Sequence, residues 1–80
     1  MTEQKIQSKR IKQLEADGYY VIKLIQTNKN GIPDLVAIKK DCQCVLFSEV
    51  KTPKGKLSKL QEYRLKQLDE HGFKTEVFRG

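Results

Sequence analysis

The sequence has few of the residues that staple small domains or bind zinc: two cysteines and one histidine among 80 residues. Cys42 and Cys44 are separated by one residue, so they cannot build a disulfide framework across the fold, and we expect both to stay reduced as small apolar residues near a turn. With His71 they are one ligand short of a four-ligand zinc site within one chain. A site that pools cysteines from two chains stays open as the lesser alternative.

Long apolar runs are also missing. No stretch approaches the roughly 18 apolar residues of a membrane span, and the first ten residues have no hydrophobic segment of the signal-peptide type. We therefore expect a soluble, intracellular, cytoplasmic protein with no membrane partner. No internal repeat, low-complexity segment or linker divides the sequence, and 80 residues leave room for one small domain, residues 1–80.

What is abundant is positive charge. Sixteen Lys and Arg residues face ten Asp and Glu residues, which gives a formal net charge of +6 and a pI near 9.5. Such a balance favours a polyanionic partner, and nucleic acid is the first candidate. Hydrophobic residues make up 38% of the chain, which is enough to predict a folded domain with a modest core.

The first predicted element is a helix over residues 2–17. Thr2 can cap its start, and Gly18 supplies the left-handed position that commonly ends a helix. At 100° per residue, Ile6, Leu14 and Ile11 fall within an arc of about 140° that we expect to be buried. The same arc contains polar residues, namely Glu3, Gln7 and Arg10.

Three strands are predicted next. Residues 19–25 form a β-branched and aromatic run, and residues 34–39 and 43–51 form two apolar-rich runs joined by a short polar connector. The two later runs predict an antiparallel hairpin. A turn centred between residues 41 and 42 would pair Ile38 with Val45, although the connector leaves the register open.

The last part of the chain predicts a helix and a strand. Pro53 and Gly55 end the third strand, and Ser58 followed by Gln61 matches the capping box that opens a helix running to about residue 70. Residues 73–78 predict a final strand, which we expect to run parallel to a neighbour because a helix precedes it. The order helix, three strands, helix, strand predicts a small α/β fold with one mixed sheet flanked by helices.

Two acidic residues carry the predicted chemistry. In the register above, Asp34 lies opposite Glu49, and like charges opposite each other destabilise a sheet unless a cation relieves them. Carboxylates suit Mg²⁺, which accepts one or two of them and takes further ligands from water and substrate phosphates. Lys51 shares a strand face with Glu49 and could stabilise transition-state charge. The pattern predicts phosphodiester hydrolysis assisted by a metal ion.

These residues resemble a known family. Gly31-Ile32-Pro33-Asp34, followed after fourteen residues by Glu49-Val50-Lys51, is similar to the signature of the PD-(D/E)XK nucleases. The stretch from 49 to 55, together with Leu57-Ser58 and Gln61, resembles the VRR-NUC branch of that superfamily. The resemblance covers nearly the whole chain and implies a restriction-endonuclease-like αβββαβ core.

The resemblance also implies roles for individual residues. Asp34 and Glu49 would hold Mg²⁺ or Mn²⁺ with the backbone carbonyl of Val50, Lys51 would be the catalytic lysine, and Gln61 would approach the site. Glu3 matches the acidic residue that the family's first helix directs toward the metal. Gln61 and Glu3 each have an ordinary alternative, because both suit a helix N-terminus. Some relatives have a tyrosine where Leu65 stands, and a role that needs its hydroxyl is absent here.

Basic residues surround this constellation, and we expect the following to contact DNA phosphates: Lys54, Lys56 and Lys59 after the third strand, and Lys9 and Arg10 on the first helix. We regard His71 as structural. The main hypothesis is a metal-dependent, structure-selective DNA endonuclease that acts without a small-molecule cofactor, and the alternative is a non-catalytic nucleic-acid-binding or accessory module. Stand-alone VRR-NUC domains resemble junction-resolving nucleases, so we also expect a homodimer that cuts branched DNA such as Holliday junctions. Exposed aromatic residues at 19, 20, 73 or 78 would form its interface.

Overall fold

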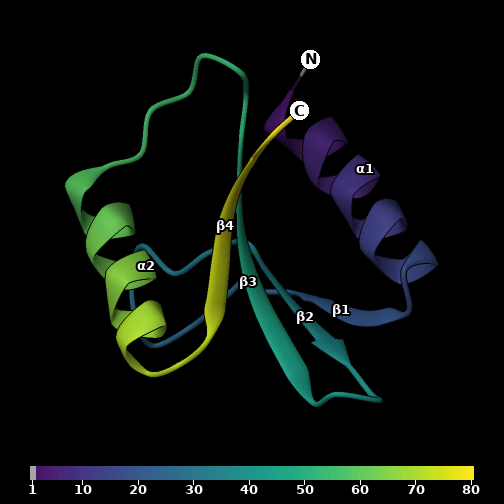
Figure 1. Cartoon of the computed structure of the whole chain (residues 1–80). Helices are drawn as coiled ribbons and strands as arrows, with labels where there is room; N and C mark the ends of the chain where they lie inside the picture. Colours follow the sequence, from purple (N-terminus) through teal and green to yellow (C-terminus); the bar gives the residue numbers. More distant parts are fainter. Residues whose placement is uncertain (1) are drawn as a thin grey trace.

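The computed structural model describes residues 2–80 and has the predicted order of elements (Figure 1). These are α1 (Glu3–Ala16), β1 (Tyr19–Lys23), β2 (Leu35–Lys39), β3 (Cys44–Lys51), α2 (Lys59–Glu70) and β4 (Lys74–Arg79). The two helices flank one four-stranded sheet, and the start of α1 and the end of β4 lie near each other at the top of the view. The predicted α/β class and its single mixed sheet are confirmed.

The strands follow the spatial order β1-β2-β3-β4. β2 pairs antiparallel with β1 and with β3, while β4 pairs parallel with β3 after the α2 crossover. Ile38 faces Val45, which confirms the predicted hairpin register. Because residues alternate between faces along a strand, this register fixes which side chains meet each helix.

The core lies between α1 and the sheet. Ile6 of α1, Leu35 of β2 and Val50 of β3 are fully buried against one another, and Val21 and Phe78 pack around them. The predicted face of α1 is confirmed, because Leu14 is also buried and Ile11 is partly buried. Each Å² of apolar surface that is buried stabilises the fold by about 25 cal/mol, so this layer is the main stabilising contact of so small a domain.

The opposite layer is looser. Every residue of α2 is at least partly exposed, and Leu60, in its first turn, is 41% exposed. α2 packs against β4 at one edge of the sheet, so it covers a narrower surface than α1 does. The capping box and the His71 contact to the carbonyl of Gln67 (2.7 Å) help to hold the two ends of this helix.

Strand boundaries differ from the prediction mainly in β1, which ends at Lys23 rather than at residue 25. The N–H of Leu24 still donates to the carbonyl of Asp34 (2.8 Å), but Ile25 turns away and is 86% exposed. The apolar character of Ile25 suggested a longer strand, whereas β2 offers it no partner. The other predicted bounds agree to within about one residue.

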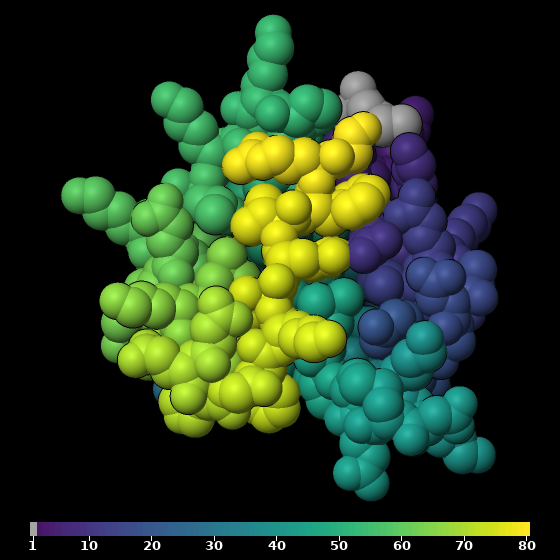
Figure 2. Space-filling view, viewed as in Figure 1, coloured from purple at the N-terminus to yellow at the C-terminus, as the bar shows by residue number. Residues whose placement is uncertain are grey.

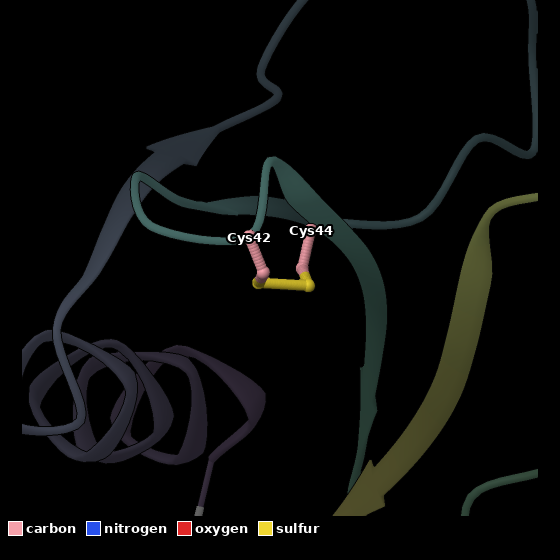
Figure 3. Close-up of a disulfide and its surroundings, with 2 residues drawn as sticks. All are labelled: Cys42 and Cys44. Atoms are coloured by element: carbon pink, nitrogen blue, oxygen red, sulfur yellow. A yellow bond between two sulfur atoms is a disulfide. The ribbon is translucent and has the colours of Figure 1, made fainter.

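The expectation of reduced cysteines is wrong for this structure, in which Cys42 and Cys44 form a disulfide (Figure 3). The prediction placed both as reduced, small apolar residues near a turn. Cys42 does lie in the β2–β3 turn, but Gln43 adopts a positive φ of 53°, and the two Cα atoms are 5.1 Å apart. That separation is in the range that a disulfide bridges. The disulfide therefore closes the turn of the β2–β3 hairpin. Zinc is bound by cysteine thiolates, so the disulfide-bonded cysteines are not available as zinc ligands.

Within residues 2–80, the helices are too short or too polar for any of them to cross a lipid bilayer.

Candidate functional site

The site begins where the chain enters β2. Asp34 is the residue before that strand, and the register that pairs Leu35 with Ser48 carries it opposite Glu49. Its Oδ2 accepts a hydrogen bond from the N–H of Val50 at 2.9 Å. This bond links the start of β2 to β3, so the carboxylate of Asp34 is held against the backbone of Val50, next to Glu49.

A glycine allows the approach to Asp34. Gly31 has a φ of +79°, which L side chains rarely adopt, and a Cβ at this position would lie 2.7 Å from Cγ of Leu60. The loop before β2 can therefore touch the first turn of α2, and Pro33, which follows, is buried. The Gly-x-Pro-Asp pattern thus has a physical basis: it seats α2 beside the acidic residues.

Glu49 is the central residue of the site and is only 2% exposed. Its Oε1 accepts a hydrogen bond from Nε2 of Gln61 at 2.9 Å, and Nζ of Lys51 lies 3.9 Å from the same oxygen. Among residues 2–80, none donates a hydrogen bond to its buried Oε2. A buried carboxylate oxygen without a partner is costly and calls for an explanation.

The electrostatics of Glu49 reflect this arrangement. Burial raises its pKa from 4.5 to about 7, and the nearby carboxylate of Asp34 adds to the increase. The ammonium group of Lys51 lowers the pKa, and Glu3 raises it by a smaller amount. The carboxyl group is thus poised to bind a cation, which would stabilise its ionised form.

Gln61 performs both of the roles that the sequence left open. Its Oε1 accepts from the backbone N–H of Ser58 at 2.9 Å, and its backbone N–H donates to Oγ of Ser58 at 3.1 Å, which completes the capping box. The Nε2 of the same amide donates to Glu49. Capping and site contact are therefore simultaneous.

Glu3 is placed less favourably. It begins α1 and is exposed, and it lies near enough to raise the pKa of Glu49. The part of the chain that the structure describes, however, contains no group of three His, Cys, Asp or Glu side chains close enough to hold a metal ion. Glu3 therefore does not complete a three-carboxylate cluster with Asp34 and Glu49, and its predicted metal role has only this electrostatic support.

The basic loop after β3 projects from the body of the molecule. Lys54, Lys56 and Lys59 are exposed, and the segment between β3 and α2 stands out at the top left of the space-filling view (Figure 2). Its backbone is nonetheless tied to β4, because Arg79 donates to the carbonyl oxygens of Thr52 (3.2 Å) and Gly55. Lys54 and Lys56 thus extend from an anchored loop that follows β3, and Lys59 extends from the first residue of α2.

The two basic residues predicted on α1 differ from each other. Lys9 is exposed and lines a shallow groove on the outer face of the helix with Lys5 and Lys12. Arg10 instead donates to both carboxylate oxygens of Glu76 at 2.8 and 2.9 Å, and its guanidinium lies over the ring of Phe78. The assignment of Arg10 to DNA contact is corrected, because these partners already use its charge to attach α1 to the sheet.

Sequence reasoning missed the partners of Arg10. Oγ of Ser48 also donates to Glu76 at 2.6 Å, so three polar residues from α1, β3 and β4 form one network. The polar residues on the buried arc of the first helix were the signal for this network, but its partners depend on the parallel register that sets Ser48 opposite Glu76. Sequence reasoning also missed the hydrogen bond between Asp34 and Val50, which depends on the residue at which β2 begins.

These observations fit a hard divalent cation. The orphan Oε2 of Glu49 and the adjacent carboxylate of Asp34 offer oxygen ligands, and two carboxylates suffice for Mg²⁺ when water and phosphate supply the rest. Lys51, whose side chain is 13% exposed, supplies a positive charge at the same place.

Comparisons with known proteins identify the family and the fold. The family model for the VRR-NUC domain matches residues 1–80. A solved structure described as a VRR-NUC domain superimposes with a TM-score of 0.86 at 26% identity, covering 98% of this chain and 84% of that chain. The search of curated proteins returned no match. The fold, the motif residues and the family match together establish that this chain belongs to the VRR-NUC domain family of nuclease-type domains.

Proposed function

We propose that this domain is a DNA endonuclease that hydrolyses phosphodiester bonds with a divalent metal ion, Mg²⁺ or Mn²⁺. The observation that carries the proposal is the buried Oε2 of Glu49, which lies without a hydrogen-bond partner among residues 2–80. Asp34 and Glu49 would hold the ion together with the backbone carbonyl of Val50. An ion held there would supply Lewis acidity toward the phosphate and would lower the pKa of a bound water.

The chain's own residues would divide the remaining work. Lys51 brings an ammonium group next to Glu49, where it can stabilise the negative charge that develops on the phosphate. Lys54, Lys56 and Lys59 would contact backbone phosphates, which position the duplex without reading its sequence. Gln61 would orient Glu49 through their hydrogen bond.

Cleavage assays test this proposal directly. Metal-scrubbed protein is incubated with linear, nicked, flapped and four-way-junction DNA, with and without Mg²⁺ or Mn²⁺. We expect cleavage only with metal. Asp34→Asn is the matched control, because it removes one negative charge and keeps the shape of the side chain. Metal-dependent cleavage that survives this substitution would contradict the assignment of the site.

A non-catalytic DNA-binding module is the alternative. It predicts that Mg²⁺ leaves thermal stability unchanged, whereas binding at Asp34 and Glu49 raises the melting temperature as the ion concentration exceeds its Kd. DNA binding together with no metal-dependent change in melting temperature and no cleavage would favour this alternative.

We further propose that the domain acts as a homodimer on branched DNA such as a four-way junction. Tyr20 faces Ile38 across the β1–β2 pair and Ile22 follows on the same face, and these side chains are 72%, 36% and 41% exposed. α2 packs against β4, the edge strand farthest from β1, and so leaves these residues uncovered. Phe73, which follows α2, is 41% exposed. A second copy on this face would bury the apolar surface and fix two sites at one separation.

Two aromatic residues predicted for the interface do not belong to it. Tyr19 is only partly exposed with Lys39 over its ring, and Phe78 packs against the core beneath Arg10. Light scattering at micromolar concentration tests the remaining patch. We expect a dimer for the natural chain and a monomer for Tyr20→Lys. A monomer in both cases, with equal cleavage of flaps and junctions, would overturn the dimer and the junction preference and leave the metal site untouched.

A further inference from the structure

The capping box of α2 and the candidate site share one side chain. A glutamine amide has one oxygen that accepts hydrogen bonds and one NH₂ group that donates them. In Gln61 the oxygen is used by the N–H of Ser58 and the NH₂ by Glu49, each at 2.9 Å. A flipped amide would place oxygen against the carboxylate and NH₂ against an N–H. Both contacts would then be repulsive, so the cap and the site specify the same orientation.

Ser58 fixes the backbone from which this amide extends. Its Oγ accepts the N–H of Gln61 at 3.1 Å, and its own N–H holds the side-chain oxygen. Both halves of the reciprocal pair therefore meet at Ser58. Without the hydroxyl, the first turn of α2 loses its cap, and Gln61 regains rotamers that do not reach Glu49.

The consequence for Glu49 is that its two oxygens differ. Gln61 and Lys51 both lie on the side of Oε1, whereas Oε2 lacks a hydrogen-bond partner within residues 2–80. A side chain fixed in this way presents one defined oxygen to a cation. Partners that orient a ligand typically change metal affinity or activity by about 10- to 100-fold when they are removed.

We propose that Ser58 is a positioning residue: through the capping box it orients the Gln61 amide, which in turn fixes Glu49 with Oε2 turned to the metal. The proposal rests on the proposed metal-dependent function for its effect on activity. Its geometric part concerns Ser58, Gln61 and Glu49 alone and can be measured without metal or DNA.

The test compares Ser58→Ala with two further variants. Ser58→Thr keeps a capping hydroxyl and should behave as the natural chain. Lys66→Gly weakens α2 at an exposed interior position, at a cost of about 1 kcal/mol that is similar to that of a lost N-cap, and it leaves the cap intact. This variant separates loss of helix stability from loss of orientation.

Three readouts are used: the side-chain NH₂ resonances of Gln61 in metal-free protein, the Mn²⁺ affinity, and kcat and KM on junction DNA. In Ser58→Ala we expect the Gln61 resonances to move toward those of an exposed glutamine such as Gln43, and the Mn²⁺ affinity to fall about tenfold. At saturating metal, kcat should fall by a similar factor while KM stays within about twofold. Lys66→Gly and Ser58→Thr should match the natural chain.

Unchanged Gln61 resonances in Ser58→Ala, or equal Mn²⁺ affinities in Ser58→Ala and Lys66→Gly, would overturn the positioning role. Failure of the proposed function gives a different result. In that case the natural chain cleaves no DNA, while the resonances of Gln61 still respond to loss of the Ser58 hydroxyl.

Discussion

Two carboxyl groups on the neighbouring strands β3 and β4 have contrasting surroundings. Glu76 faces α1 and is fully engaged, by two bonds from Arg10 and one from Ser48. Glu49 directly follows Ser48 in β3, so its side chain faces the other side of the sheet. There its Oε2 lacks a hydrogen-bond partner among the described residues, and its pKa rises to about 7. The first carboxylate is satisfied by the fold itself, whereas the second keeps capacity for a ligand.

The difference in hydrogen bonding between Glu76 and Glu49 distinguishes a carboxylate with a structural role from one with a functional role. Buried ionised groups persist when they are paired and hydrogen-bonded, and an unpaired one is usually retained for another purpose. On this argument the Arg10–Glu76–Ser48 network attaches α1 to the sheet, and Glu49 with Asp34 would bind the cation that we propose.

The largest expected effect comes from Glu49→Gln. It removes one metal ligand charge and should lower cleavage by at least about 10³-fold, since metal stabilisation of the reacting phosphate is worth several kcal/mol. The fold should persist, because the neutral amide also relieves repulsion from Asp34. Circular dichroism and cleavage rates in metal-scrubbed buffer with Mg²⁺ restored check both points. Cleavage close to that of the natural chain would remove the distinction between the two carboxylates.

Lys51→Ala should have the next largest effect on the rate. Loss of one positioned charge at the phosphate typically costs about 10²-fold in kcat, with a smaller change in DNA binding. Single-turnover cleavage and equilibrium binding separate the two quantities. A loss confined to binding would indicate that Lys51 only attracts DNA.

Glu76→Gln should reverse the pattern seen at Glu49. It leaves Arg10 without its ion-pair partner at a site where the two side chains are 18% and 25% exposed, so we expect a loss of about 1–3 kcal/mol in the free energy of unfolding. Cleavage per folded molecule should change little. Urea denaturation monitored alongside activity measures both. A stable but inactive Glu76→Gln protein would contradict the assignment of this network to structure.

The pH dependence of stability should report the state of Glu49. Its pKa is 4.5 in the unfolded chain and about 7 in the fold, so the folded state binds the proton more tightly. Metal-free protein should therefore lose stability as the pH rises from about 4.5 to about 7, by up to about 3 kcal/mol, and then level off. Mg²⁺ should raise the melting temperature more at pH 8 than at pH 6. Glu49→Gln should abolish both trends.

The smallest effect is expected from the basic loop. Lys54→Ala and Lys56→Ala should each weaken binding to every DNA form and reduce the slope of log K against log salt by about one unit. Arg10→Gln serves as a contrast, because it also removes one positive charge, but it should leave the salt slope unchanged since Arg10 is engaged with Glu76. Salt slopes unchanged by the loop substitutions would show that these lysines face away from DNA.

Much of this domain could be predicted from local pattern. Caps at Thr2 and Ser58, the glycine at 18, and the apolar periodicity of the first helix located the helices, while β-branched runs located the strands. The short connector left the register open, and a turn centred between residues 41 and 42 was the arrangement that paired Ile38 with Val45 and placed Asp34 opposite Glu49, as the structure does. These features depend on residues close in the chain, which is why the sequence alone predicts them.

Other features depend on residues that are distant in sequence. The Arg10–Glu76 pair spans 66 positions, and only the parallel register of β4 brings Ser48 to it. The Cys42–Cys44 disulfide needed the positive φ of Gln43, which no residue type in that turn requires. The exposure of Leu60 reflects how little sheet α2 covers.

The sequence by itself therefore determined the order of elements and the candidate residues Asp34, Glu49 and Lys51, because these are encoded in spacing along the strands. The family, and with it the expectation that Gln61 approaches the site, came from the resemblance of the motifs to the VRR-NUC pattern. Only the tertiary structure decided which charges remain available. It engaged Arg10 with Glu76 and left Oε2 of Glu49 without a partner in residues 2–80. The physical reason is that burial and hydrogen bonding, which set the cost of a charge, depend on neighbours that only packing brings together.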